Sequence, residues 1–424
     1  MFEVLLSIGV FVGLLVIGVP VAFAIFAGCV AGVYALGHVP MEVVAQQSFS
    51  QTSSYELLAI PFFIFTADLL FGGNLGKQVI GLATRIVGRL RGGVGMTSVL
   101  TSLVFSGVSG SAVADATGLG KVLIPWTTRI GYPASYGAAV NASSSVIGII
   151  VPPSIPMILY SAASGASVAA VFTAGIVPGI IMAAVLMVGC WFVAMWQKLP
   201  TVRAKLTPKK LLIDLLLATP AILIPVILIR VVLFTGVATV TEVSVLTTLY
   251  ALLLRFLIYR DLSWRGFVRS TAESAAASAI VLLLVMFSSA MAWLFTMQQA
   301  PQMMADFLTG TFTSDAMVTA AMIVTLLVVG MFLDMSPAIL LLTPVLIPTA
   351  EAIGMGPIHL GIVMVVTLAM GLYTPPVGTT LYISAAIGRV SIVDTVRQLI
   401  PFYAMAIVVI LLVAYLPGWM AISG

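Results

Sequence analysis

Apolar runs of about twenty residues recur along the whole chain, and the polar stretches between them leave no room for a sizeable soluble domain. A helix needs roughly 20 apolar residues to cross the hydrocarbon core of a bilayer. Hydrophobic residues make up 61% of the 424 residues and charged residues only 8%, and the mean hydropathy is +1.21. Because no soluble domain of ordinary composition approaches these values, we predict an all-α polytopic membrane protein with about ten transmembrane helices.

Lysine and arginine are unevenly distributed along the chain. They gather at 77–91, 198–210 and 255–269, whereas 38–56 and 298–315 contain none. Since membrane proteins keep their basic loops in the cytoplasm, we place the three basic segments inside the cell and the other two outside it. These loops account for the net charge of +4, so we expect no nucleic-acid partner.

The apolar runs and the loop charges together predict the path of the chain. We expect two short spans within 4–37, an interfacial segment at 41–56, an amphipathic surface helix at 77–91, and spans at 57–75, 168–197, 211–235, 238–258, 273–297 and 400–418. Two further segments, 93–128 and 316–350, must enter and leave the membrane on one face to satisfy the charge pattern. They are predicted to be re-entrant helical hairpins, and both chain termini are then predicted to be periplasmic.

A repeat with a period of 223 residues relates the two halves. At this shift Val122-Leu-Ile-Pro125 falls on Val345-Leu-Ile-Pro348, and Pro152-Pro153 falls on Pro375-Pro376. Gly131, Gly148, Gly165 and Pro178 likewise meet Gly354, Gly371, Gly388 and Pro401 without a gap. Four of the six prolines between 122 and 178 thus meet another proline, which 22 prolines in the whole chain would not produce by chance.

Equivalent segments of the two halves are predicted to cross the membrane in opposite directions. We therefore divide the chain into inverted repeats, 1–210 and 211–424, with broken helices at 133–165 and 358–386. Inverted repeats with broken helices are typical of secondary transporters, whose binding sites form where the repeats meet.

The two Pro-Pro pairs interrupt apolar segments and expose backbone carbonyls. Proline has no N–H and disfavours α conformation in the residue before it. Non-helical backbone at membrane depth is tolerated where it lines a site, and carbonyl and hydroxyl oxygens suit a small hard cation. We predict one cation site at Ser109, Gly148, Val151 and Pro153, and a second at Gly371, Thr374, Pro376, Asp334 and Ser336.

Helices that restart after each break direct the positive ends of their dipoles at the same region, which favours an anion. Polar side chains beside the breaks are therefore predicted to bind an anionic substrate: Ser111, Asn141, Ser144, Ser154, Asp334 and Thr379.

Three residues near the hairpin tips have alternative interpretations. Asp115 caps the returning hairpin limb or binds an ion or substrate. Ser336, followed by Pro337, is either a helix N-cap, a ligand or both. "GVSG" at 107–110 also matches the Gly-x-Ser-Gly pattern of intramembrane serine proteases, which would make Ser109 a nucleophile. The two histidines are both predicted near the external face, so this third interpretation lacks a base.

Longer motifs resemble one transporter family along nearly the whole chain. They are "LLAIPFFIFTADLL", "FSGVSGSAVAD", "GYPASYGAAVNASSSVIGIIVPPSIPMILYS", "FTAGIVPG" and "GLYTPPVGTTLYISAAI". Together they resemble the large membrane subunit of tripartite ATP-independent periplasmic (TRAP) transporters.

The resemblance implies a non-enzymatic protein of the bacterial inner membrane. It implies import of an organic acid, such as a C4-dicarboxylate, sialic acid or another sugar acid, by an elevator movement. In such a movement the hairpins and broken helices would form a mobile domain, and the remaining spans would form its scaffold. It also implies coupling to two or more Na⁺ ions without an organic cofactor. The expected partners are a separate small four-helix membrane subunit, a periplasmic substrate-binding protein and membrane lipid. A self-sufficient sodium and organic-anion symporter is the alternative.

Overall fold

The computed structural model describes residues 2–71, 75–201 and 237–417, and this part of the chain is helical without any strand. The predicted span 211–235 lies outside the described residues. In chain order the elements are α1 (Phe2–Val16), α2 (Val21–Leu36), α3 (Glu42–Ser50), η1 (Gln51–Ser53), η2 (Tyr55–Leu58), α4 (Ala59–Phe71), α5 (Leu75–Val87), α6 (Gly93–Ser109), α7 (Ala112–Arg129), α8 (Ala134–Ser144), α9 (Ile147–Ile150), α10 (Ile155–Ser164), α11 (Val168–Trp196), α14 (Val240–Leu253), η4 (Leu254–Tyr259), α15 (Trp264–Met297), α16 (Ala300–Thr311), α17 (Asp315–Phe332), α18 (Met335–Ala352), α19 (Pro357–Gly371), α20 (Thr379–Gly388) and α21 (Ile392–Tyr415).

The protein is a multi-pass membrane protein. Six helices in the described part are long and apolar enough to cross a bilayer, and two bent pairs of helices raise this number to eight. One bent pair joins Glu42–Ser53 to Tyr55–Leu70 at 65°, and the other joins Ala134–Ile150 to Ile155–Ser164 at 45°. The second pair is the broken helix that the sequence predicts at 133–165. The total of about ten spans stays a prediction.

Most predicted elements are present, two helices begin well before the predicted residue, and one helix was not predicted. The run 4–37 forms two helices, α1 and α2, separated by Gly18 with a φ of +86° and by Pro20. α15 begins at Trp264 rather than at 273, because Ser263 caps it and its first turns lie in the basic segment that we expected to be a loop. α21 begins at Ile392 rather than at 400 because Ser391 caps it. The segment 298–315, for which no helix was predicted, contains α16.

The repeat of 223 residues is visible in the element bounds. α7, moved by 223 residues, coincides with α18, and α6 moved in the same way differs from α17 by one residue at its start. α8 moved by 223 begins where α19 begins, and α10 moved likewise lies one residue before α20. Equivalent parts of the two halves therefore have the same order and nearly the same length. Their opposite orientation in a membrane stays a prediction.

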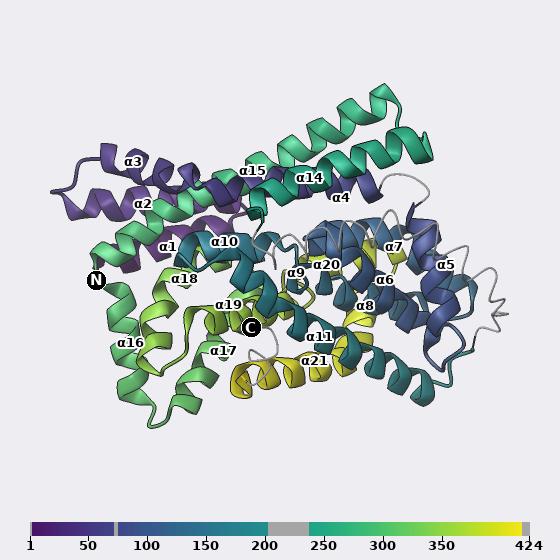
Figure 1. The fold of residues 1–424 in the computed structure, drawn as a ribbon. Coiled ribbons are helices and arrows are strands. Elements are labelled where there is room, and N and C mark those ends of the chain that lie inside the picture. The colour runs from purple at the N-terminus through teal and green to yellow at the C-terminus, as the bar shows by residue number, and fades with distance from the viewer. Residues whose placement is uncertain (1, 72–74, 202–236, 418–424) are drawn as a thin grey trace.

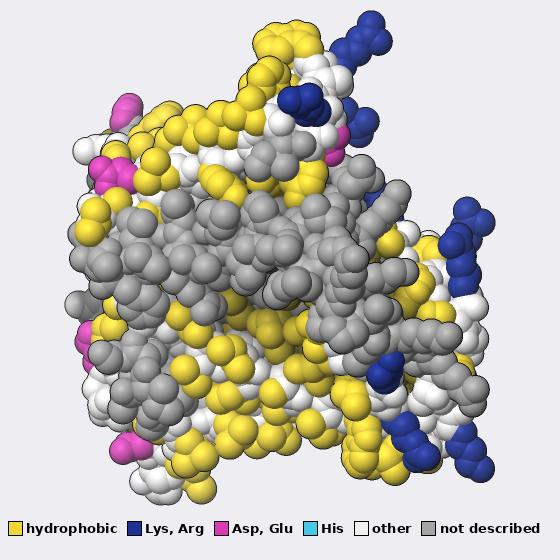
Figure 2. Space-filling view, turned by 45° about the vertical axis from the view of Figure 1, so that its right-hand side comes forward, with side chains coloured by type: hydrophobic (Ala, Val, Ile, Leu, Met, Phe, Trp, Pro, Cys, Tyr) yellow, Lys and Arg dark blue, Asp and Glu magenta, His cyan; other side chains and the backbone are white. Residues whose placement is uncertain are grey.

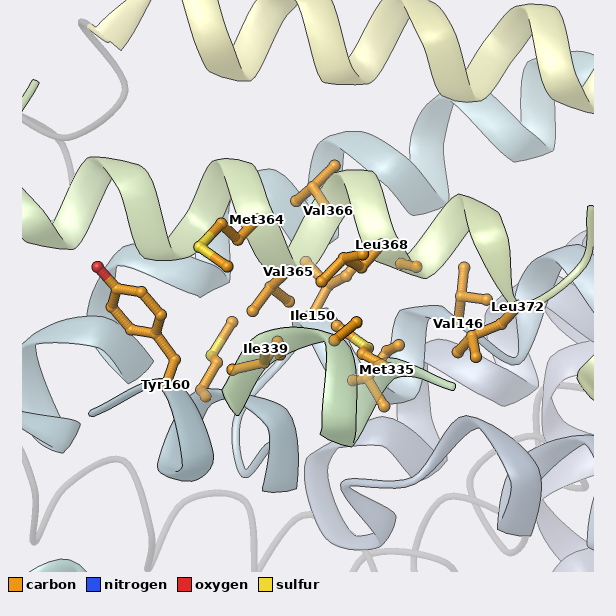
Figure 3. Close-up of a cluster of buried hydrophobic side chains, with 14 of the residues drawn as sticks. Val146, Ile150, Tyr160, Met335, Ile339, Met364, Val365, Val366, Leu368 and Leu372 are labelled. Atoms are coloured by element: carbon orange, nitrogen blue, oxygen red, sulfur yellow. The ribbon is translucent and has the colours of Figure 1, made fainter. Parts of the chain in front are cut away.

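The core is centred on the two broken helices. α8 and α19 are apolar or small on all sides, as expected of helices surrounded by protein, and Leu360–Met370 is buried throughout. Figure 3 shows Ile150, at the first break, near Ile339 of α18 and Val365 of α19, and Val146 beside Leu372 at the C-terminal end of α19. The Tyr160 hydroxyl also donates a hydrogen bond to the carbonyl of Pro357. The core thus joins the two repeats to each other.

A layer of helices covers one side of this core. In Figure 1, α2, α3, α4, α14 and α15 run along the top of the molecule, above the hairpins and broken helices. α15 contacts α2, α3 and α4 within the layer, and it also contacts α18 below. Figure 2 shows Lys and Arg gathered at the right-hand end of one face, whereas most of the visible Asp and Glu lie at the left.

Candidate functional site

The tip of the first hairpin is a tight turn between α6 and α7. α6 ends at Ser109, and Gly110 adopts the left-handed conformation with a φ of +60°. Ser111 then caps α7, since its hydroxyl accepts a hydrogen bond from the N–H of Ala114 at 3.3 Å. Small residues with these backbone preferences explain why a glycine-rich and serine-rich stretch interrupts apolar sequence at this position.

The first break begins where two prolines remove helix donors. Pro152 and Pro153 lie four residues after Gly148 and Ile149, so the carbonyls of these two residues receive no N–H bond from the next turn. The Ser154 hydroxyl donates to the Ile149 carbonyl at 2.5 Å and accepts from the N–H of Met157 in the first turn of α10. The carbonyl of Gly148 therefore remains available to a ligand.

Asp115 lies beside this break, fully buried. Neither of its carboxylate oxygens has a hydrogen-bond partner among the residues that the structure describes, and the same is true of the Ser109 hydroxyl. A Cβ added to Gly148 would lie 2.4 Å from Asp115 Oδ2 and 3.3 Å from Ser109 Oγ, so all three residues border one small space. The capping role considered for Asp115 is wrong, because Ser111 caps α7. A buried carboxylate without a partner is costly, which makes this space a good place for a cation.

The other residues of the first predicted cation site lie at the break beside the hairpin tip. The N–H of Ile155 donates to the Gly110 carbonyl at 3.3 Å and ties the hairpin tip to the start of α10. Val151 and Pro153 are buried at the break, and the Pro153 carbonyl would lie 3.0 Å from a Cβ on Gly110. The structure thus brings together the four residues of the first predicted cation site and adds Asp115 to them.

The second break repeats the pattern in a more open form. Pro375 and Pro376 again lie four residues after two carbonyl groups, those of Gly371 and Leu372. The Leu372 carbonyl accepts from both the N–H and the hydroxyl of Thr380, each at 2.9 Å. The Gly371 carbonyl accepts from the N–H of Thr374. Thr374 is half-buried and Pro376 is exposed, so this break is less enclosed than the first.

At the second hairpin tip, the residue at the N-cap of α18 is not the predicted one. Asp334 occupies the N-cap position of α18, and Ser336 lies inside the helix, so the N-cap role considered for Ser336 is wrong. Both residues are half-buried. The N–H of Val377 donates to the Met331 carbonyl at 3.2 Å and ties this break to its own hairpin, as Ile155 does in the first half. The hydroxyl of Thr379, a neighbour of Asp334, has no partner among the described residues.

The two hairpin tips meet at one cavity of about 580 Å³. One wall comes from Ser109–Ala114 and from the following turns of α7, and the tip Asp334–Ser336 contributes a second part. The opposite wall belongs to the covering layer, with Asp68 on α4 and Glu273 and Ser274 on α15. The cavity therefore lies between the core, which contains both breaks, and the layer.

The six predicted substrate residues lie in different surroundings. Ser111 and Asp334 line the cavity. Asn141 donates to the Ala116 carbonyl at 3.0 Å and to Ser384 Oγ at 2.8 Å, so its amide joins α8 to α7 and α20. Like Asn141, the other three do not belong to the described cavity wall: Ser144 accepts from Ser102, Ser154 caps α10, and Thr379 neighbours Asp334.

Sequence reasoning did not place Asp68, Lys121 and Glu273 at the site. They reach the cavity from three different helices, and only the tertiary fold brings them together. All three carried one usable signal, since each is a charged residue within or beside a predicted membrane segment.

Comparisons with known proteins agree with this arrangement. The YdaH transporter of Alcanivorax borkumensis superimposes with a TM-score of 0.63 over 92% of this chain and 89% of its own, at 14% identity, which indicates a shared fold. The 2,3-diketo-L-gulonate TRAP transporter large permease protein YiaN of Escherichia coli is 32% identical over 98% of this chain and 97% of its own length. The sialic acid TRAP transporter large permease protein SiaM of Vibrio cholerae is 33% identical over 97% and 96%.

The family model described as "Tripartite ATP-independent periplasmic transporter, DctM component" matches residues 8–419. Its members are transport permeases and not enzymes, which removes the protease interpretation of Ser109. The motifs that suggested this resemblance are thus part of a match over nearly the entire sequence. The chain belongs to the TRAP transporter family and is a large permease, or DctM, component.

Proposed function

We propose that the protein couples the entry of Na⁺ to the import of an organic acid. The observation that carries this proposal is the buried carboxylate of Asp115, which lies without a described partner beside Ser109 and Gly148 at a break in the membrane core. A cation at this position would neutralise the carboxylate and bind the free carbonyl of Gly148. Unwound backbone carbonyls of broken helices bind Na⁺ in secondary transporters, and carboxylate oxygens also suit a hard cation.

A second Na⁺ is proposed at the equivalent break, near Gly371, Thr374 and Pro376 with Asp334. Support comes from the repeated sequence pattern, in which each Pro-Pro pair lies four residues after two carbonyl groups. Further support comes from the hydrogen bond that joins each break to its hairpin. Cations at both sites would order the two hairpin tips, which line the same cavity. Ion binding and substrate binding would then be coupled through shared residues.

We propose that transport occurs by an elevator movement of the core against the covering layer. The cavity lies at the boundary between these two parts, so a sliding movement would change the side to which it opens. Lys and Arg gather at one end of the face in Figure 2, and most visible Asp and Glu lie at the other. This distribution supports placing the basic end in the cytoplasm and the acidic end in the periplasm. With this orientation the described termini lie on the periplasmic side, and we propose that the two halves are inverted repeats.

The substrate and partners are proposed from the family. The relatives named above transport 2,3-diketo-L-gulonate and sialic acid by their names, and we propose a sugar acid or a dicarboxylate here. Both carry the anionic group that helix N-termini at the two hairpin tips would favour. A small membrane subunit and a periplasmic binding protein that delivers the acid are the proposed partners.

Uptake into proteoliposomes tests this function. The chain is reconstituted with the small subunit, the binding protein is added outside, and radiolabelled organic acids are offered under an inward Na⁺ gradient. We expect accumulation that needs all three proteins and disappears when K⁺ replaces Na⁺. Concentrative uptake by this chain alone would favour the self-sufficient symporter, and uptake that is unaffected by removal of Na⁺ would contradict sodium coupling.

A further inference from the structure

The wall of the cavity contains a continuous stripe of α7. Ala114, Thr117, Gly118 and Lys121 all line it, and they follow one another at intervals of three or four residues. Residues at these intervals share one face of a helix. The stripe therefore leads from the hairpin tip at Ser111 along α7 to Lys121.

Lys121 is the only lysine or arginine among the described residues that line the cavity. Three acidic residues line it as well, and Glu273 is paired with Arg269 on its own helix, with 2.7 Å between Nε and Oε1. A cation at the second proposed site would neutralise Asp334 in part. Lys121 is exposed and makes no ion pair with a described residue, so its positive charge is available to an incoming ligand.

The position of Lys121 suits one end of an elongated acid. It lies nine residues after Ala112, roughly 13 Å along the helix axis, and helical side chains lean back toward the N-terminus. If the anionic group of such an acid bound to Lys121, the rest of the acid would lie beside the tip of the first hairpin. There the first N–H groups of α7 and α18 offer hydrogen bonds.

We propose that Lys121 binds the anionic group of the substrate, a carboxylate or a sulfonate, within this cavity. The proposal rests on the proposed function, since it assumes that the cavity receives an organic anion. It adds a substrate-positioning residue to a site whose other lining charges are all negative.

Charged thiol reagents test whether Lys121 makes the cavity attractive to anions. Cys29 and Cys190, both buried, are replaced by alanine in the full chain, and Thr117→Cys places one thiol a helical turn before Lys121. The detergent-solubilised protein is labelled with an anionic sulfonatoethyl and a cationic trimethylammonioethyl methanethiosulfonate, and the ratio of the two rates is measured. Removing a unit charge at this range changes each rate severalfold and in opposite directions.

We expect Lys121→Gln to lower the anionic-to-cationic rate ratio about tenfold and Lys121→Arg to preserve it. Lys198→Gln, which removes a lysine outside the cavity wall, is the matched control and should leave the ratio unchanged. An unchanged ratio in Lys121→Gln would overturn the proposal. Labelling needs neither a Na⁺ gradient nor a binding protein, so its result is independent of the uptake experiment.

A second measurement separates substrate binding from local charge alone. For the acid that the reconstituted complex accumulates, Lys121→Gln should raise the KM about tenfold with little change in the maximal rate, and Lys121→Arg should restore the KM. This change corresponds to one lost charged hydrogen bond. An altered labelling ratio with an unchanged KM would overturn the role in substrate binding.

Discussion

Gly148 and Asp115 are so close that a Cβ on Gly148 would lie 2.4 Å from the carboxylate oxygen Oδ2 of Asp115. Contact at this distance is repulsive, so any larger residue at 148 forces the carboxylate away from the break. The glycine is therefore needed to let a buried carboxylate, a hydroxyl and a backbone carbonyl face the same space.

Gly148→Ala is expected to abolish sodium-dependent uptake while the protein still inserts and folds. The atom that the new methyl group meets belongs to a side chain, and Asp115 can rotate away at a cost of about 1–3 kcal/mol. Uptake into proteoliposomes measures the loss of transport, and the thermal unfolding midpoint shows whether the protein still folds. Gly189→Ala in α11 is the control, since its Cβ would make ordinary contacts of 3.4 Å or more with Met405 and Phe402 of α21. Normal sodium-driven uptake by Gly148→Ala would refute the assignment.

Gly371→Ala, at the equivalent position of the second repeat, should behave differently. Its Cβ would lie 2.3 Å from the carbonyl oxygen and 2.5 Å from the carbonyl carbon of Gly330, which are backbone atoms of α17. Two helices must separate to make room, so we expect a loss of about 3 kcal/mol or more in stability. Fluorescence-detected thermal unfolding in detergent measures this loss. A midpoint equal to that of Gly189→Ala would show that the contact between α17 and α19 is looser than described.

Elements with local causes could be predicted from the sequence, and contacts between distant helices could not. The prolines and glycines of the repeat are local constraints on the backbone, and the helix breaks that they predicted are present at those positions. The helix pairs α6–α7 and α17–α18 occupy the segments of the predicted hairpins, whose re-entrant course in a membrane stays a prediction. α16 was missed because 298–315 was interpreted through its lack of basic residues, which indicates a side of the membrane and not a conformation. The pairing of Asp115 with Gly148, and that of Asn141 with Ser384, depend on tertiary packing between helices.

Asn141→Leu distinguishes a structural role from a role in substrate binding. The Asn141 amide donates two hydrogen bonds inside the protein, and leucine would leave the buried Ala116 carbonyl and Ser384 hydroxyl without these donors. We expect a loss of about 1–3 kcal/mol in stability and an unchanged KM in the molecules that remain folded. A raised KM at unchanged stability would favour the substrate role predicted from the sequence.

Equivalent exposed positions at the ends of α7 and α18 test the inverted repeat. Arg129 and Ala352 are 223 residues apart and both are exposed. In a chain without Cys29 and Cys190, Arg129→Cys should react with a membrane-impermeant maleimide only in inside-out vesicles. Ala352→Cys should react only in right-side-out vesicles. Labelling of both positions from the same side would show that the repeats are parallel.

The central claim is that the break beside Asp115 binds Na⁺, and direct measurement of binding tests it. Purified wild-type protein is titrated with ²²Na⁺ in a scintillation proximity assay and compared with Asp115→Asn, which keeps the side-chain shape and removes the charge. Asp306→Asn, on the exposed side of α16, is the control for loss of one acidic charge. We predict saturable binding by wild type and Asp306→Asn, and at least about tenfold weaker binding at one site in Asp115→Asn. Sodium binding by Asp115→Asn that equals wild type would contradict the account.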